Sequence, residues 1–192
     1  MAKKILLAGI VGGLALFVWG GLSHMVLGLG EAGMQFLPQQ QPVMQALQAS
    51  IPQSGFYMFP QGDKAGNLPA NEAGGPYGLL IYHSTGASGM RPAQLVNECI
   101  LDIVLATLAA YLLSLAHALG RYAARVGLVF VVGLIAALMT HVQYWNWYAF
   151  PTTYTVANIF DNLIGFLIVG LVAAAFVKPV VTQVVSMPAR AA

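Results

Sequence analysis

The sequence has few charged residues and only one cysteine. Charged residues occupy 7% of the 192 positions, against about 25% in ordinary soluble domains. Because so few charges cannot cover a water-facing surface, we expect lipid to surround most of the chain. The net charge of +2 is too small to favour a nucleic-acid partner. Cys99 alone allows no intrachain disulfide and no thiolate metal site, and we interpret it as a buried structural thiol.

Motifs of common soluble catalytic sites are also missing. The sequence contains no GxSxG, Walker loop, HExxH or CxxC. We therefore assign no catalytic residue, and an enzyme that acts on lipid or quinone is the least favoured functional hypothesis.

Long apolar runs are abundant. Hydrophobic residues form 58% of the chain and the mean hydropathy is +0.74. A membrane-spanning helix needs about 20 apolar residues, and four runs reach that length. We predict an all-α integral membrane protein with one membrane domain over residues 1–192, a four-helix transmembrane bundle. The spans are expected at residues 5–27, 94–118, 124–147 and 156–177.

One long polar segment, residues 28–93, separates the first two spans. A short helix is predicted at Val43–Ile51. Two apolar runs, Gly55–Phe59 and Tyr77–His83, are expected to pair as a β-hairpin. Because long structureless loops are uncommon in compact domains, we predict a small ordered cap. Disorder around Asp63–Gly75 is the alternative.

Basic residues are distributed unevenly between the two sides of the predicted bundle. With four spans, both termini and the link between spans two and three share one side. By the positive-inside bias, this side faces the cytoplasm and residues 28–93 are extracytoplasmic. We therefore predict a multi-pass protein of the bacterial cytoplasmic (inner) membrane. Six of the eight basic residues lie on the cytoplasmic side: Lys3, Lys4, Arg121, Arg125, Lys178 and Arg190.

Polar residues are predicted at a similar depth in all four spans. The aromatic residues 144–150 mark the outer membrane interface, where Trp and Tyr gather. An ionisable group in the membrane costs roughly 2.5–3.5 kcal/mol near the centre, so we expect such groups to pair. The polar residues near the outer ends are His24, Glu98, Asp102, His141, Asn158, Asp161 and Asn162.

Because these residues are expected at a similar depth, we predict an outer-leaflet cluster of His24, His141, Asp102 and Asp161 with Glu98 at its rim. Two imidazoles and two carboxylates would suit a zinc, iron or manganese ion. They would equally suit a hydrogen-bonded network without a metal, which we prefer. His24 and His141 are also the candidate ligands of a single haem or of chlorophyll magnesium. A quinone site, a lipid-headgroup site and a proton path are the remaining alternatives.

Small residues predict which face of the first span packs. Gly9, Gly13, Gly20 and His24 fall on one face of that helix. Small residues let membrane helices approach closely. This face is therefore predicted to turn toward the bundle and to point His24 inward.

Three segments carry a resemblance over nearly the whole chain. They are Trp19–Gly20–x–x–Ser23–His24–Met25, Gly55–Phe56–Tyr57–x–Phe59–Pro60 and Tyr144–Trp145–Asn146–Trp147–Tyr148–x–Phe150–Pro151. The chain resembles a group of small bacterial four-span membrane proteins without an assigned function. The resemblance implies the four-span fold and supplies no catalytic residue.

These observations favour a structural or accessory subunit of a larger bacterial membrane complex, of which respiratory and photosynthetic complexes are the bioenergetic examples. The expected partners are membrane lipid and other membrane-protein subunits, and no cofactor is the preferred expectation. The alternative is a membrane protein that binds a small molecule, a metal, haem, chlorophyll or quinone at the outer His/Asp cluster.

Overall fold

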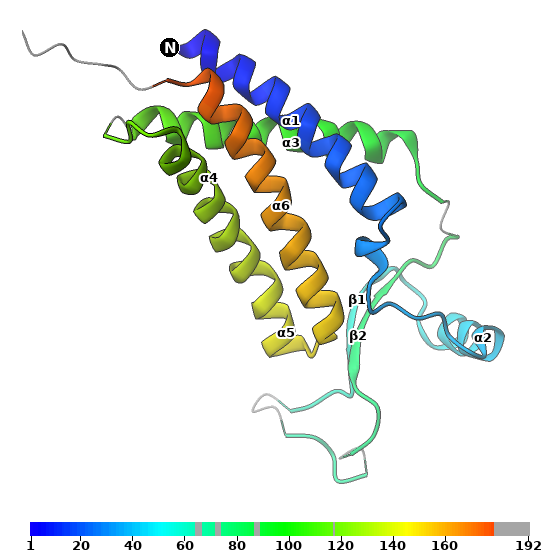
Figure 1. Cartoon of the computed structure of the whole chain (residues 1–192). Coiled ribbons are helices and arrows are strands. Elements are labelled where there is room, and N and C mark those ends of the chain that lie inside the picture. Colours follow the sequence, from blue (N-terminus) through cyan, green and yellow to red (C-terminus); the bar gives the residue numbers. More distant parts are fainter. Residues whose placement is uncertain (64–66, 72–73, 87–88, 117, 179–192) are drawn as a thin grey trace, which may run out of the picture.

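The computed structural model describes residues 1–63, 67–71, 74–86, 89–116 and 118–178. This part of the chain is mostly helical, and four of its helices are long and apolar enough to cross a membrane (Figure 1). These helices confirm the prediction of four candidate spans, and their ends lie within four residues of the expected positions. The spans are α1 (Ala2–Met25), α3 (Pro92–Leu115), a helix over Tyr122–Tyr148, and α6 (Thr152–Phe176).

The four spans converge at one end and spread apart at the other (Figure 1). The converging end holds the N terminus, and we call it the N-terminal end. The opposite end holds Met25, Pro92 and Tyr148, and we call it the hairpin end because the β-hairpin lies there. Helix α1 packs most extensively against α3 and α6, and α6 packs against α4. Helix α3 makes smaller contacts with α6 and α4.

The helix of the third span contains an irregular turn that the sequence did not predict. It consists of α4 (Tyr122–Ala137), the π-helical turn η2 (Leu138–Val142) and α5 (Gln143–Tyr148). Ala149, with a φ of 54°, takes the left-handed conformation and ends α5. Such π-turns are frequent at functional sites, and this one carries His141.

Glycines set the distances between the spans. A Cβ added at Gly13 would overlap the backbone of Ile103, and one at Gly9 would overlap Thr107, so α1 and α3 are in close contact there. These contacts confirm the predicted packing face for both glycines. A Cβ at Gly20 would meet nothing within 4 Å, so Gly20 does not set a helix contact.

The apolar core lies between the spans. Gly133 lets α4 approach Phe166 of α6, where a Cβ would overlap the phenylalanine side chain. Small and β-branched residues such as Ala106 and Val129 fill the rest of the core. Because most core residues are small or β-branched, the helices can approach closely, as membrane packing favours.

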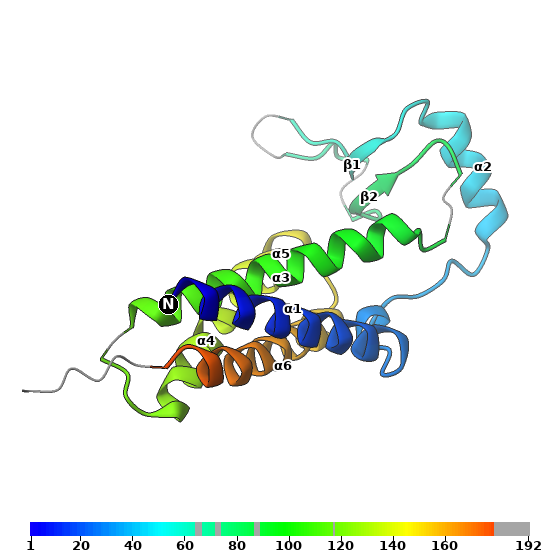
Figure 2. The ribbon, with the colours of Figure 1, turned by 90° about the horizontal axis from the view of Figure 1, so that it is seen from above.

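The described part of the segment between the first two spans contains short helices and a two-stranded sheet. It contains η1 (Leu29–Glu31), α2 (Gln40–Ser50) and the antiparallel strands β1 (Gly55–Phe59) and β2 (Gly78–Tyr82). The hairpin prediction is therefore confirmed. Helix α2 has no buried residue and lies away from the spans in both views (Figures 1 and 2).

Candidate functional site

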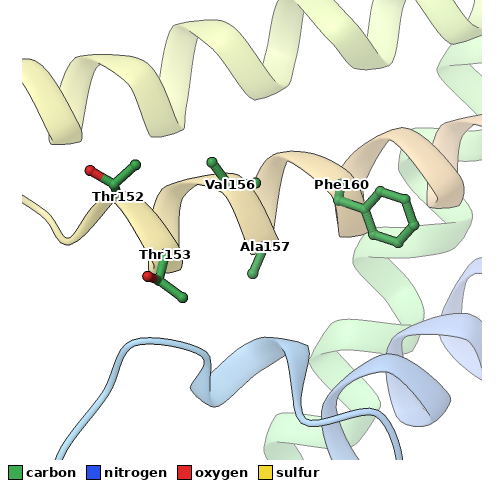
Figure 3. Close-up of a pocket in the computed structure, with 5 residues that line it drawn as sticks. All are labelled: Thr152, Thr153, Val156, Ala157 and Phe160. Carbon is green, nitrogen blue, oxygen red and sulfur yellow. The ribbon is translucent and has the colours of Figure 1, made fainter.

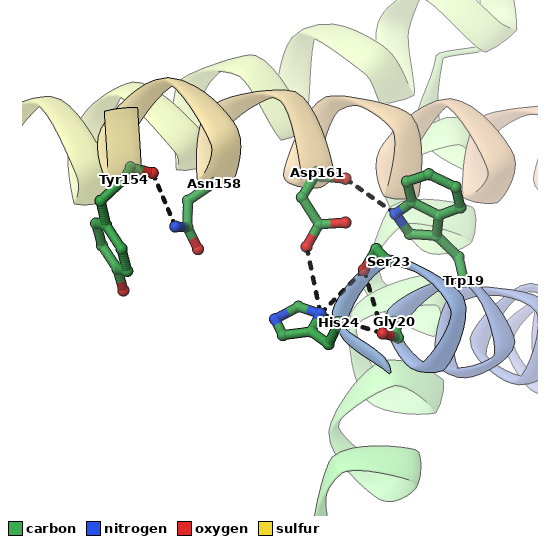
Figure 4. Close-up of polar contacts among 7 residues, drawn as sticks. All are labelled: Trp19, Gly20, Ser23, His24, Tyr154, Asn158 and Asp161. Carbon is green, nitrogen blue, oxygen red and sulfur yellow. Dashed lines mark hydrogen bonds and ion pairs between the residues drawn. The ribbon is translucent and has the colours of Figure 1, made fainter. Parts of the chain in front are cut away.

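The polar contact between α1 and α6 at the hairpin end begins at Trp19. A Cβ at Gly165 would lie 2.7 Å from the Leu16 side chain, so a glycine there lets α1 approach α6. The indole Nε1 of Trp19 donates a hydrogen bond to the Asp161 carbonyl oxygen at 3.2 Å (Figure 4). A buried indole N–H normally requires such an acceptor. This bond fixes the backbone of Asp161 opposite the last turns of α1.

His24 faces the Asp161 carboxylate across this contact. Its Nδ1 lies 3.8 Å from Asp161 Oδ2, 2.9 Å from Ser23 Oγ and 3.1 Å from the Gly20 carbonyl oxygen. The His24 side chain is 51% exposed and that of Asp161 is 17% exposed. The imidazole is therefore open to the surroundings, while the carboxylate is mostly enclosed.

The η1 segment covers the opposite edge of the imidazole. A Cβ at Gly30 would overlap His24 Cδ2 and would lie 2.8 Å from Nε2. Only glycine fits there with the ring in this position. His24 therefore links three elements: α1, α6 and η1.

Ser23, His24 and Asp161 have the composition of a catalytic triad but not its geometry. In a triad, the serine contacts one ring nitrogen and the carboxylate contacts the other. Here both approach Nδ1 of His24. Ser23 is fully buried and donates to the Gly20 carbonyl oxygen at 3.1 Å. This arrangement does not activate Ser23 as a nucleophile.

His141 of the third span lies within electrostatic range of the same carboxylate, without a hydrogen bond or an ion pair to it. It lies in η2, is partly buried and interacts electrostatically with Asp161. Asp161 therefore contacts His24 directly and interacts with His141 only electrostatically. The Asn158 amide donates instead to the Tyr154 carbonyl oxygen at 2.8 Å, within α6.

Asp102 and Glu98 lie apart from this contact. Ile103 packs on Gly13, which is eleven residues from His24, or about 16 Å along α1. Asp102 is therefore opposite the middle of α1, where it is buried with 6% exposure. Glu98 is exposed and interacts electrostatically with Asp102. The contacts of Gly9 and Gly13 fix the position of α3 along α1. They place Asp102 deeper in the helix bundle than is predicted by counting residues from the start of its span.

The four predicted metal ligands are not assembled in this structure. Within the described ranges, no group of three or more His, Cys, Asp or Glu residues could hold a metal ion. For a single-histidine porphyrin ligand, Gly30 lies beside the Nε2 edge of His24, so ligation there requires η1 to move.

Three buried oxygens on the first half of α6 have no hydrogen-bond partner among the described residues. They are Thr155 Oγ1, Asp161 Oδ1 and Asn162 Oδ1. Most buried polar atoms in proteins are paired, so these oxygens can accept a water or a polar ligand. Sequence reasoning found Asp161 and Asn162 but missed Thr155, which lies seven residues before Asn162 on the same helix face. It also missed Trp19, whose polar ring inside a span was the available signal.

A shallow hollow of 520 Å³ lies on the same half of α6 (Figure 3). All of its lining residues belong to α6, and none of them is titratable. Its chemistry suits a hydrocarbon chain or a neighbouring helix. The lining residues are Thr152, Thr153, Val156, Ala157 and Phe160.

Comparisons of the chain with protein-family models, with curated proteins and with solved structures found no match.

Proposed function

We propose that the chain is a non-enzymatic accessory subunit that assembles with other proteins of a bacterial membrane complex, such as a respiratory or photosynthetic one. The observation that carries this proposal is the low burial of the spans. Only 22 to 33% of each apolar window is buried inside the chain. Exposed apolar side chains such as Leu108 of α3 and Val131 of α4 are also available to lipid and to partner subunits.

Glycines on uncovered faces favour a protein partner over lipid alone. A Cβ at Gly21 or Gly127 would meet nothing within 4 Å. Glycine destabilises a helix by roughly 0.5–1 kcal/mol relative to alanine, and contact with lipid does not offset this loss. Small residues on a membrane helix are typical of helix–helix interfaces. The Gly127 face of α4 is therefore the strongest candidate for a partner helix.

The proposed topology places the N-terminal end in the cytoplasm and the hairpin end outside, in the bacterial inner membrane. Lys3, Lys4, Arg121, Arg125 and Lys178 support it, because they lie at the N-terminal end. Arg190, the sixth basic residue assigned to this side, lies outside the described residues. In this topology the β-hairpin and α2 form an extracytoplasmic cap, and the His24–Asp161 contact holds its first segment against α6.

Native purification tests the accessory role. The tagged chain, extracted in mild detergent from its own membrane, should elute with a partner at fixed stoichiometry. Gly127→Leu should release the partner, whereas Val131→Leu, an apolar change on the same exposed α4 surface, should retain it. Elution of the unmodified chain as a partner-free monomer would contradict the proposal.

A second candidate function is favoured by the three unpaired oxygens on α6. In it, the Asp161 region binds a polar small molecule, and the two histidines contribute a metal, haem or chlorophyll ligand. An absorption spectrum and metal analysis of the natively purified chain test it. A bound component that is lost in Asp161→Asn and retained in Asn158→Ala would support this function. Absence of pigment, metal and any extractable ligand would remove it.

A further inference from the structure

The aromatic end of the third span forms a rigid surface. The left-handed Ala149 turns the chain so that the Phe150 N–H donates to the Tyr144 carbonyl oxygen at 3.4 Å. The Tyr144 and Phe150 rings stack with centroids 5.3 Å apart, and Tyr148 lies 5.9 Å from Tyr144. We call Tyr144, Tyr148 and Phe150 the aromatic wall. Because its rings hold one another, this wall is formed without any ligand.

The β-hairpin presents an apolar face toward this wall. Phe56 pairs with Ile81 and Met58 pairs with Leu79, and side chains two residues apart share a face of a strand. We call these four residues the hairpin face. Phe56, Met58 and Ile81 are 66%, 67% and 73% exposed. Exposed apolar patches of this kind mark binding sites, and an isolated two-stranded hairpin is only marginally stable.

A groove of 630 Å³ separates the aromatic wall from the hairpin. This volume lies within the range of small-molecule sites, about 300–1,000 Å³. None of the described residues that line the groove is charged. Among the described residues, the hydroxyls of Tyr77, Tyr144 and Tyr148 have no hydrogen-bond partner. The lining residues are Phe56, Tyr77, Gly78, Leu79, Ile81, Tyr144, Tyr148, Ala149, Phe150 and Pro151.

The position of the groove restricts what can enter it. Tyr148 ends the third candidate span, so the groove lies where the apolar spans meet the polar segment. An occupant can therefore insert a hydrocarbon tail along the spans while its polar part stays among the tyrosines. A phosphate headgroup does not suit the lining, because it is recognised by Arg or Lys. The occupant is therefore an uncharged amphiphile.

We propose that this groove binds an uncharged lipid with a planar, acceptor-bearing ring, the chemical class of the isoprenoid quinones. The aromatic wall stacks on the ring, and the free tyrosine hydroxyls donate to its carbonyl oxygens. The hairpin face covers the other side of the ring. The inference concerns binding only. It goes beyond the accessory role and does not depend on the His24–Asp161 contact.

Titration of the purified full chain with decylubiquinone tests the proposal. Trp145 and Trp147 lie between Tyr144 and Tyr148 in the sequence, so their fluorescence reports binding. Quenching should saturate, and Tyr148→Ala should weaken binding about tenfold, as loss of an aromatic contact residue does. Tyr111→Ala is the matched control, because Tyr111 is an exposed tyrosine on α3 outside the groove. It should leave the affinity unchanged.

A substitution on the hairpin side of the groove tests the proposal even if Tyr148→Ala fails to fold. Ile81→Lys alters an exposed position and places a cation in the neutral groove. It should weaken decylubiquinone binding and strengthen binding of the anionic lipid phosphatidylglycerol. The proposal is overturned if quenching does not saturate, if decanol competes as well as the quinone, or if the unmodified chain prefers phosphatidylglycerol. An equal effect of Tyr111→Ala would also overturn it.

Discussion

The two ends of the spans differ in how they are held together. From the middle of α1 toward the N-terminal end, glycine and alanine bring the helices into direct contact, as at Gly9, Gly13 and Ala106. At the hairpin end the helices spread apart (Figure 1), and single polar contacts such as His24–Asp161 connect them. Helices in backbone contact leave no space for a ligand between them. Where the helices spread apart, the structure has the hollow on α6, the groove at the hairpin and the unpaired oxygens of α6. The difference indicates that the N-terminal end provides stability and the hairpin end provides binding surface.

The largest expected effect comes from inserting volume at the converging end. Gly13→Leu forces a side chain into the Ile103 backbone and should lower the free energy of unfolding by about 3 kcal/mol, the upper range for overpacking. Gly20→Leu, on the same helix, enters open space and should change it by about 0.5 kcal/mol or less. Thermal unfolding followed by circular dichroism in detergent measures both. Equal losses would show that the two ends do not differ in packing.

A smaller effect is expected where η1 covers His24. Gly30→Ala should displace the imidazole, because the new methyl group overlaps Cδ2. We expect a loss of about 1 kcal/mol, comparable to one hydrogen bond, and faster proteolysis between η1 and α2. In a His24→Ala background the same change should have almost no effect, since its target ring is gone. Additive losses in the double variant would show that Gly30 and His24 act independently.

The hydrogen bond of Trp19 should contribute about as much stability as the Gly30–His24 contact, and it can be removed separately. Trp19→Phe removes the donor to the Asp161 carbonyl oxygen and keeps an aromatic ring between α1 and α6. The expected loss is about 1 kcal/mol, the usual net contribution of one hydrogen bond. Trp145→Phe is the control, because its indole donates to Thr152 Oγ1 in an exposed position, and it should cost less. A larger loss for Trp145→Phe would place the main polar anchor at the aromatic turn instead.

Hydropathy and strand patterns were enough to predict the four spans and the hairpin. They also indicated His24 and Asp161, because each is a polar residue near the end of an apolar run. Asp102 could not be placed this way, since its depth depends on the Gly13–Ile103 contact between two helices. The role of Gly30 appears only after η1 folds back on α1. The π-turn at Leu138–Val142 has no sequence signal that we recognise.

The smallest expected effect separates a lipid-facing surface from a partner-facing one. Gly127→Ala places a methyl group in open space and should stabilise the isolated chain by roughly 0.5–1 kcal/mol, because alanine favours the helix. If a partner helix packs closely on Gly127, the same methyl group should reduce recovery of the complex. Stability in detergent and partner recovery from the membrane should therefore change in opposite directions. A rise in both would assign the Gly127 face to lipid.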